Sequence, residues 1–107
     1  MAKLYLTEYS GTGDIVAQGN IASQPENTTQ VVTFTGTAGV SSAFANNTSI
    51  VRLQPDGICS IAFSTYTAGA AVDPSATTSG MRMISGQTEY FKVPTGRGFK
   101  VSAITNT

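Results

Sequence analysis

Residues 50–63, IVRLQPDGICSIAF, give the clearest indication of the fold, because two runs rich in β-branched residues flank a turn. In the second run Cys59, Ile61 and Phe63 alternate with their neighbours and therefore share one face of a strand. Between the runs, a Pro-Asp-Gly sequence favours a tight turn, because Pro presets φ and Gly accepts a positive φ. The stretch predicts two short strands joined by a turn.

The rest of the chain has the same β-forming character. Thr and Ser make up 27 of its 107 residues and Val and Ile another 15, whereas Leu occurs three times. β-Branched residues lose rotamer freedom in a helix and pack well on a pleated sheet. Eleven Gly and four Pro divide the chain into short pieces, and no window carries an apolar stripe of helical period. We expect strands over residues 3–9, 14–17, 30–35, 41–45, 48–54, 57–65, 81–84 with 88–93, and 99–104, and long loops over 18–29 and 66–80.

About eight short strands in a chain of this length predict one domain, spanning residues 1–107. We expect an all-β fold, a two-sheet antiparallel β-sandwich of the jelly-roll-like kind. An immunoglobulin-like sandwich is disfavoured, because the chain has no Trp and a single Cys and so lacks the Cys, Trp, Cys pattern of antibody domains. A small β-barrel is the alternative.

The available side-chain chemistry indicates a protein that is not an enzyme. The chain has no His, which removes the commonest general base and the commonest metal ligand, and its six carboxylates are scattered along the sequence. Its one cysteine, Cys59, lies in an apolar alternating run and is expected to be a buried core residue. We therefore expect no catalytic residue, no cofactor and no metal site.

Charge and hydropathy narrow the range of partners. Six Lys+Arg balance six Asp+Glu, and only 11% of the residues are charged. A protein that binds nucleic acid needs a surplus of Lys and Arg to displace counterions from phosphates, so a nucleic-acid partner is not expected. The longest apolar run is too short for a signal peptide or a membrane span. We expect no membrane partner, and synthesis in a reducing cytoplasm.

Some strands carry apolar residues on both faces. The pairs that break alternation are Val31 with Val32, Ile50 with Val51, Ile58 with Cys59, and Tyr90 with Phe91. A sandwich strand needs only one apolar face, because the other is solvated. We expect a loop of the same chain or another subunit to cover the second face. The loop over residues 66–80, rich in small residues, is expected to lie on a partner, with a solvated loop as the alternative.

Several segments resemble small structural proteins of tailed bacteriophages. The opening MAKLYLTEY, residues 1–9, looks like the start of such proteins. The second half shows a similar order, with the CSIAF strand of residues 59–63, a Thr-rich loop ending at Thr78, and the EYFKVPTG strand and turn of residues 89–96. These segments cover the first strand and about residues 50–105. The resemblance is closest to head decoration (cement) proteins.

The resemblance implies a non-enzymatic β-sandwich at the capsid surface of the virion. Such a protein binds the major capsid protein of the assembled shell, stabilises the shell and bridges neighbouring capsomers as a homo-oligomer, a dimer or a trimer. The alternatives are a neck, tail or fibre-associated adaptor and, from another class, a carbohydrate-binding β-sandwich. Because Tyr and Arg most often anchor interfaces, the candidate contact residues are Tyr5, Tyr9, Tyr66, Tyr90 and Arg97.

Overall fold

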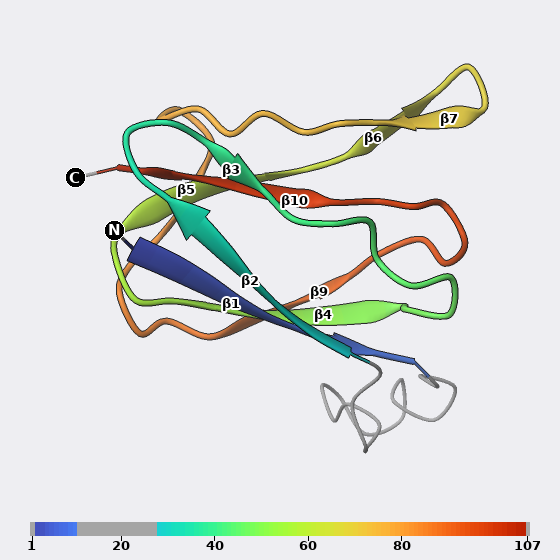
Figure 1. Ribbon diagram of the computed structural model, residues 1–107, viewed down its shortest axis with the longest axis horizontal. Coiled ribbons are helices and arrows are strands. Elements are labelled where there is room, and N and C mark those ends of the chain that lie inside the picture. The colour runs from blue at the N-terminus through green and yellow to red at the C-terminus, as the bar shows by residue number, and fades with distance from the viewer. Residues whose placement is uncertain (1, 11–27, 107) are drawn as a thin grey trace.

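The structure is a computed structural model that describes residues 2–10 and 28–106. The described residues form ten strands and no helix, so the expected all-β class is confirmed. Two four-stranded antiparallel sheets pack against each other as a β-sandwich (Figure 1). Sheet A has the strand order β2 (Thr28–Phe34), β1 (Ala2–Tyr9), β4 (Ile50–Pro55) and β9 (Glu89–Lys92). Sheet B has the order β3 (Gly39–Val40), β10 (Val101–Thr105), β5 (Cys59–Phe63) and β8 (Met81–Met83), and β6 (Thr65–Thr67) and β7 (Ala70–Val72) form a separate hairpin.

The core lies between the two sheets because apolar residues alternate along most of the strands. In β1, Leu4 and Leu6 are buried, whereas Lys3 and Tyr5 are exposed. Strands β2 and β4 repeat this pattern and place their buried residues opposite those of sheet B. The buried core contains Leu4, Leu6, Val32, Phe34, Phe44, Val51, Leu53, Cys59, Ile61, Met83, Val93, Val101 and Ala103.

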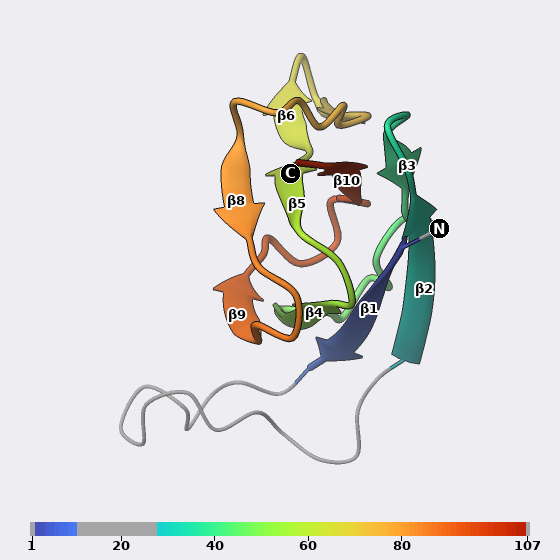
Figure 2. The ribbon, with the colours of Figure 1, turned by 90° about the vertical axis from the view of Figure 1, so that its left-hand side faces the viewer.

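The strands have the order of a jelly roll, with one difference. The strand that comes last in the chain of a jelly roll comes first here. From β2 the chain alternates between sheets A and B as far as β5. It then passes through the β6–β7 hairpin to β8 of sheet B, and returns to sheet A at β9 and to sheet B at β10. Strand β1 lies between β2 and β4, in the place that the last strand of a jelly roll takes. The two sheets remain separate (Figure 2), so the fold is the sandwich and not the small barrel.

The turn after Pro55 connects the two sheets, because β4 belongs to sheet A and β5 to sheet B. Two hydrogen bonds hold it to β1: the Asp56 N–H donates to the Lys3 carbonyl over 2.9 Å, and the Lys3 N–H donates to Asp56 Oδ1 over 2.6 Å. A Cβ atom on Gly57 would lie 2.9 Å from the Cβ atom of Ala2, so the close approach requires glycine. The Pro-Asp-Gly sequence thus forms a corner of the sandwich.

Most expected strands are present, with bounds that differ by at most two residues. The strand expected over 14–17 and all but the end of the loop expected over 18–29 lie outside the described residues, while Thr28 and Thr29 belong to β2. The segments 81–84 and 88–93 were expected as one interrupted strand, but they separate into β8 of sheet B and β9 of sheet A.

The strand expected over residues 41–45 is wrong, because its N–H groups are divided between backbone and side-chain acceptors. The N–H groups of Ser41 and Phe44 donate to backbone carbonyls of residues 101 and 99, whereas two others donate to side chains. The Ser42 N–H donates to Gln30 Oε1 over 2.9 Å, and the Ala45 N–H donates to Glu8 Oε1, also over 2.9 Å. Glu8 is fully buried and its other oxygen accepts from Gln30 Nε2 over 2.8 Å. A charged residue in the first strand therefore holds this segment as a loop.

The loop expected over residues 66–80 is also wrong in its first part, where β6 and β7 form a hairpin (Figure 1). Its two turn residues, Ala68 and Gly69, have φ values of 55° and 79°, as a two-residue turn between twisted strands requires. Ser64 separates the hairpin from β5, because its N–H donates to the Lys100 carbonyl and its Oγ accepts from the Lys100 N–H over 2.8 Å.

Candidate interaction surfaces

The outer face of sheet A brings together three of the five candidate contact residues. The register pairs Tyr5 of β1 with Val31 of β2, and Arg52 of β4 with Tyr90 of β9. Paired residues project from the same face of a sheet, as do residues two apart along a strand. By the β1–β4 register, Arg52 lies on the same side as Tyr5. Tyr5, Tyr9, Val31, Arg52 and Tyr90 therefore form one surface, called here the tyrosine face.

Three large side chains of the tyrosine face are open to solvent. The exposed fractions are 43% for Tyr5, 53% for Val31 and 41% for Tyr90. Tyr9 shares the face by register but is only 6% exposed, so little of its ring is available to a partner. Exposed apolar side chains that cluster on one side of a protein mark interaction sites, and the tyrosine face has this character.

The outer face of sheet B is covered by residues 73–80 of the same chain, which return from β7 along β10 and β5 (Figure 1). Ser60 and Ser102 project from this face and are fully buried. Ser102 Oγ accepts from the Ala76 N–H over 3.0 Å, and Asn106 Nδ2 donates to Ser60 Oγ over 2.6 Å. Because serine is small, the segment can lie close to the sheet.

The other two candidates, Tyr66 and Arg97, meet beside the β6–β7 hairpin. The guanidinium carbon of Arg97 lies 4.2 Å from the centre of the Tyr66 ring, a cation–π contact. The Tyr66 hydroxyl donates to the Gly69 carbonyl over 2.9 Å, which holds the ring against the hairpin turn. The structure thus divides the five candidates between the tyrosine face and this second position, called here the hairpin corner.

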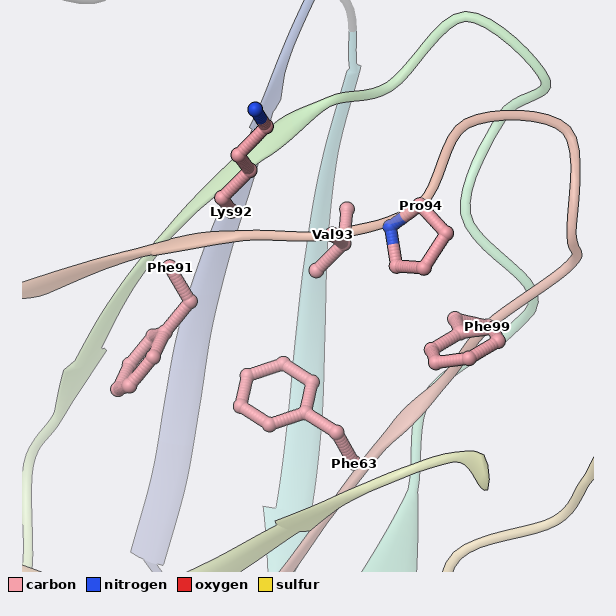
Figure 3. A pocket seen from close by; sticks show the side chains of 6 residues that line it. All are labelled: Phe63, Phe91, Lys92, Val93, Pro94 and Phe99. Carbon is pink, nitrogen blue, oxygen red and sulfur yellow. The ribbon is translucent and has the colours of Figure 1, made fainter. Parts of the chain in front are cut away.

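A small apolar pocket opens between β5 and β9 (Figure 3), lined by Phe63, Phe91, Lys92, Val93, Pro94 and Phe99. The rings of Phe63 and Phe91 are 5.1 Å apart between centres and tilted by 55°. Lys92 turns its ammonium group away from the space between the rings. The volume of about 170 Å³ is smaller than that of most small-molecule sites. The pocket has room for one apolar side chain of a partner.

The described residues hold few of the groups that catalysis uses. No three of their His, Cys, Asp or Glu side chains lie close enough together to hold a metal ion, and none of their segments is a helix long enough to cross a bilayer. Cys59 is fully buried, so the expectation of a core residue is confirmed. Burial raises the pKa of its thiol to about 11, which keeps the sulfur protonated at neutral pH and weakens it as a nucleophile.

Two residues with clear roles were not singled out as sites by the sequence. Glu8 anchors the loop that follows β3, and its position in alternation with Leu4 and Leu6 was the signal that it points inward. Val31 contributes the most exposed side chain of the tyrosine face, and the apolar pair that it forms with Val32 was its signal.

Comparisons of the chain with protein-family models, with curated proteins and with solved structures find no match. A function therefore has to be argued from the surfaces themselves and from the segments that they are built of.

Proposed function

We propose that the chain is a non-enzymatic decoration (cement) protein of a tailed-bacteriophage head. It binds the major capsid protein of the assembled shell through the tyrosine face and stabilises the shell from the capsid surface, after synthesis in the host cytoplasm. The observation that carries the proposal is the group of exposed side chains Tyr5, Val31 and Tyr90 on the outer face of sheet A. The resemblance of the first strand and of residues 50–105 to phage virion proteins supplies the identity of the partner.

The chemistry of the tyrosine face suits attachment to a protein surface. A tyrosine ring offers a large apolar area with a polar hydroxyl at its tip, and it loses little conformational freedom on binding because it has few rotatable bonds. Arg52 lies beside Tyr90 and adds a planar group with several hydrogen-bond donors. The outer face of sheet B is already covered by its own chain, whereas the described part of the chain leaves the outer face of sheet A open.

The low charge of the chain also fits this role. With six basic and six acidic residues, the protein has no net charge to be screened, so its attachment should depend little on salt. A shell presents the same site many times, and a protein that contacts two neighbouring subunits makes its second contact at a high effective concentration. Modest single contacts are therefore enough for stable attachment.

The copy number in purified particles tests the proposal. The 11.1 kDa band is quantified on a denaturing gel against the band of the major shell protein. A decoration protein should be present in numbers comparable with the shell protein. A few copies per particle would assign the chain to the neck or tail, and absence from the particle would overturn the virion role.

A matched pair of variants tests which surface makes the contact. The double variant Tyr5→Ser with Tyr90→Ser should bind particles at least about tenfold more weakly than the natural chain. Tyr66→Ser is the control, because Tyr66 is exposed to the same 43% as Tyr5 but belongs to the hairpin corner. Loss of binding by the control with retention by the double variant would move the contact to the hairpin corner. Retained binding by both, with binding to a glycan array, would favour the carbohydrate-binding alternative.

A further inference from the structure

The two sheets end in four edge strands, and one of them differs from the other three. Edge strands usually avoid pairing with other chains by being short or by carrying charges. In sheet B, β3 has two residues and β8 carries a central Arg82; in sheet A, β9 begins with Glu89 and ends with Lys92. Strand β2, TTQVVTF, is seven residues long and contains no charge, no Pro and no Gly. Among the four edges that the described residues form, it has the fewest of these protective features.

The hydrogen bonds of β1 show which backbone groups of β2 point outward. The N–H and C=O groups of Lys3 both bond to Asp56, on the β4 side of β1, so they point away from β2. In an antiparallel pair, the residue opposite such a position also points its backbone groups away from the pair, and the direction alternates along the strand. Since Lys3 lies opposite Thr33, the backbone groups of Thr29, Val31 and Thr33 point to the free edge.

The outward groups of Thr33 are not open, because Gly39 lies against them. A Cβ atom built on Gly39 would clash with the Thr33 carbonyl oxygen, so the two backbones touch. Within the described part of the chain, the outward groups of Thr29 and Val31 have no backbone partner. Their side chains are exposed, Val31 by 53%, so solvent reaches this part of the edge.

We propose that β2 pairs with β2 of a second copy of the chain, antiparallel and around a two-fold axis at Gln30. In this register Thr29 of each copy lies opposite Val31 of the other, and the two pairs each exchange both of their N–H and C=O bonds. Lys or Glu on this edge would repel its own copy, whereas two identical uncharged strands meet without a charge conflict. The result is one continuous sheet of eight strands.

The pairing joins the two tyrosine faces on one side of the enlarged sheet, because paired residues project from the same face. Tyr5, which lies opposite Val31 in its own copy, is then two strands away from the partner's Thr29. A dimer would therefore present two tyrosine faces in a fixed relation to each other. The dimer itself does not rest on the proposed function, since it follows from the β2 edge alone.

The mass of the full-length chain in solution tests the inference. Sedimentation equilibrium at about 100 µM, a concentration that detects a weak association, should give twice the mass of the 11.1 kDa chain. Val31→Pro removes an outward N–H without removing a hydrogen bond to β1, and proline is tolerated at such edge positions. We expect Val31→Pro to weaken dimerisation at least about tenfold. Val31→Thr keeps the N–H and the strand propensity, and should dimerise like the natural chain.

Thermal unfolding of each variant shows whether it has folded. Should Val31→Pro fail to fold, Val31→Lys replaces it, because two lysines close to the two-fold axis repel each other and the loss should shrink at high salt. A natural chain that is monomeric at this concentration, or a folded Val31→Pro that still dimerises, would overturn the inference.

The dimer and the proposed function fail separately. The Tyr5→Ser, Tyr90→Ser variant should dimerise like the natural chain while binding particles poorly. A chain that dimerises and is absent from particles would retain the dimer and overturn the virion role.

Discussion

The outer faces of the two sheets differ in the size of their side chains and in what covers them. On sheet B, Ser60 and Ser102 are small and fully buried, and residues 73–80 of the same chain lie over them. On sheet A, Tyr5 and Tyr90 are large and more than two-fifths exposed. Of these two outer faces, only that of sheet B receives a cover from the described part of the chain.

The difference follows from side-chain size. A segment can lie directly on a sheet only where short side chains leave its backbone room for hydrogen bonds, as the bond between the Ala76 N–H and Ser102 Oγ shows. Tyrosine rings stand above the sheet and present a surface suited to the side chains of a partner. The covered face therefore contributes to folding stability, and the open face should contribute to binding.

The largest expected effect comes from enlarging a side chain on the covered face. Ser102→Leu removes the acceptor of the Ala76 N–H and forces residues 73–80 away from sheet B, and should cost about 3 kcal/mol of unfolding free energy. Thr7→Leu, the matched change on the open face, should cost less than about 0.5 kcal/mol. Urea unfolding of both variants measures the difference, and equal losses would contradict the comparison.

The next largest expected change in unfolding free energy at neutral pH comes from a buried residue between the two sheets. Glu8 is fully buried and its oxygens accept hydrogen bonds from Ala45, Thr48 and Gln30. Glu8→Gln turns one acceptor into a donor that faces other donors, and should cost about 2 kcal/mol of unfolding free energy. Glu89→Gln changes an exposed carboxylate of β9 in the same way and is the control, with a change within about 0.5 kcal/mol. A tolerant Glu8 would show that the loop over residues 41–45 does not need its anchor.

Cys59, on the inner face of sheet B, gives stability a dependence on alkaline pH. Burial raises the pKa of its thiol from 9.0 to about 11, so the folded chain holds this proton more tightly than the unfolded chain. The stability that the protonated thiol contributes is complete below pH 9 and is lost as the pH rises through about 11, by about 3 kcal/mol. Cys59→Ala should lack this part of the decline, which unfolding curves between these pH values would reveal. Parallel declines would contradict the assignment.

The smallest expected change in stability is in the β6–β7 hairpin, which belongs to neither of the two main sheets. Ala68 adopts a φ of 55°, a left-handed conformation that suits glycine better than alanine. Ala68→Gly should stabilise the chain by about 0.5 kcal/mol. Ala70→Gly, within strand β7, should instead lower the stability by a similar amount. A loss of stability at both positions would contradict the turn geometry.

The sequence was a good guide to where strands occur and a poor guide to the segments between them. Alternation and turn residues are local, so the strands around Leu53 and Ile61 lie close to where the pattern predicts them. The strand expected over residues 41–45 failed because Glu8 and Gln30, far away in the chain, bind its backbone. Sequence alone also left Tyr66 and Arg97 as separate candidates, since 4.2 Å between them depends on the fold.

Local patterns in the sequence are enough to predict that the protein is all-β, that its strands are short, and that some of them are apolar on both faces. These properties depend on β-branched residues, on a period of two and on turn residues, each of which acts within a few positions. The folded arrangement was needed to show that Tyr5, Val31 and Tyr90 share an open face, that residues 73–80 cover the other sheet, and that β2 is an uncharged edge. The reason is that faces and edges arise from the pairing of strands that are distant in the chain.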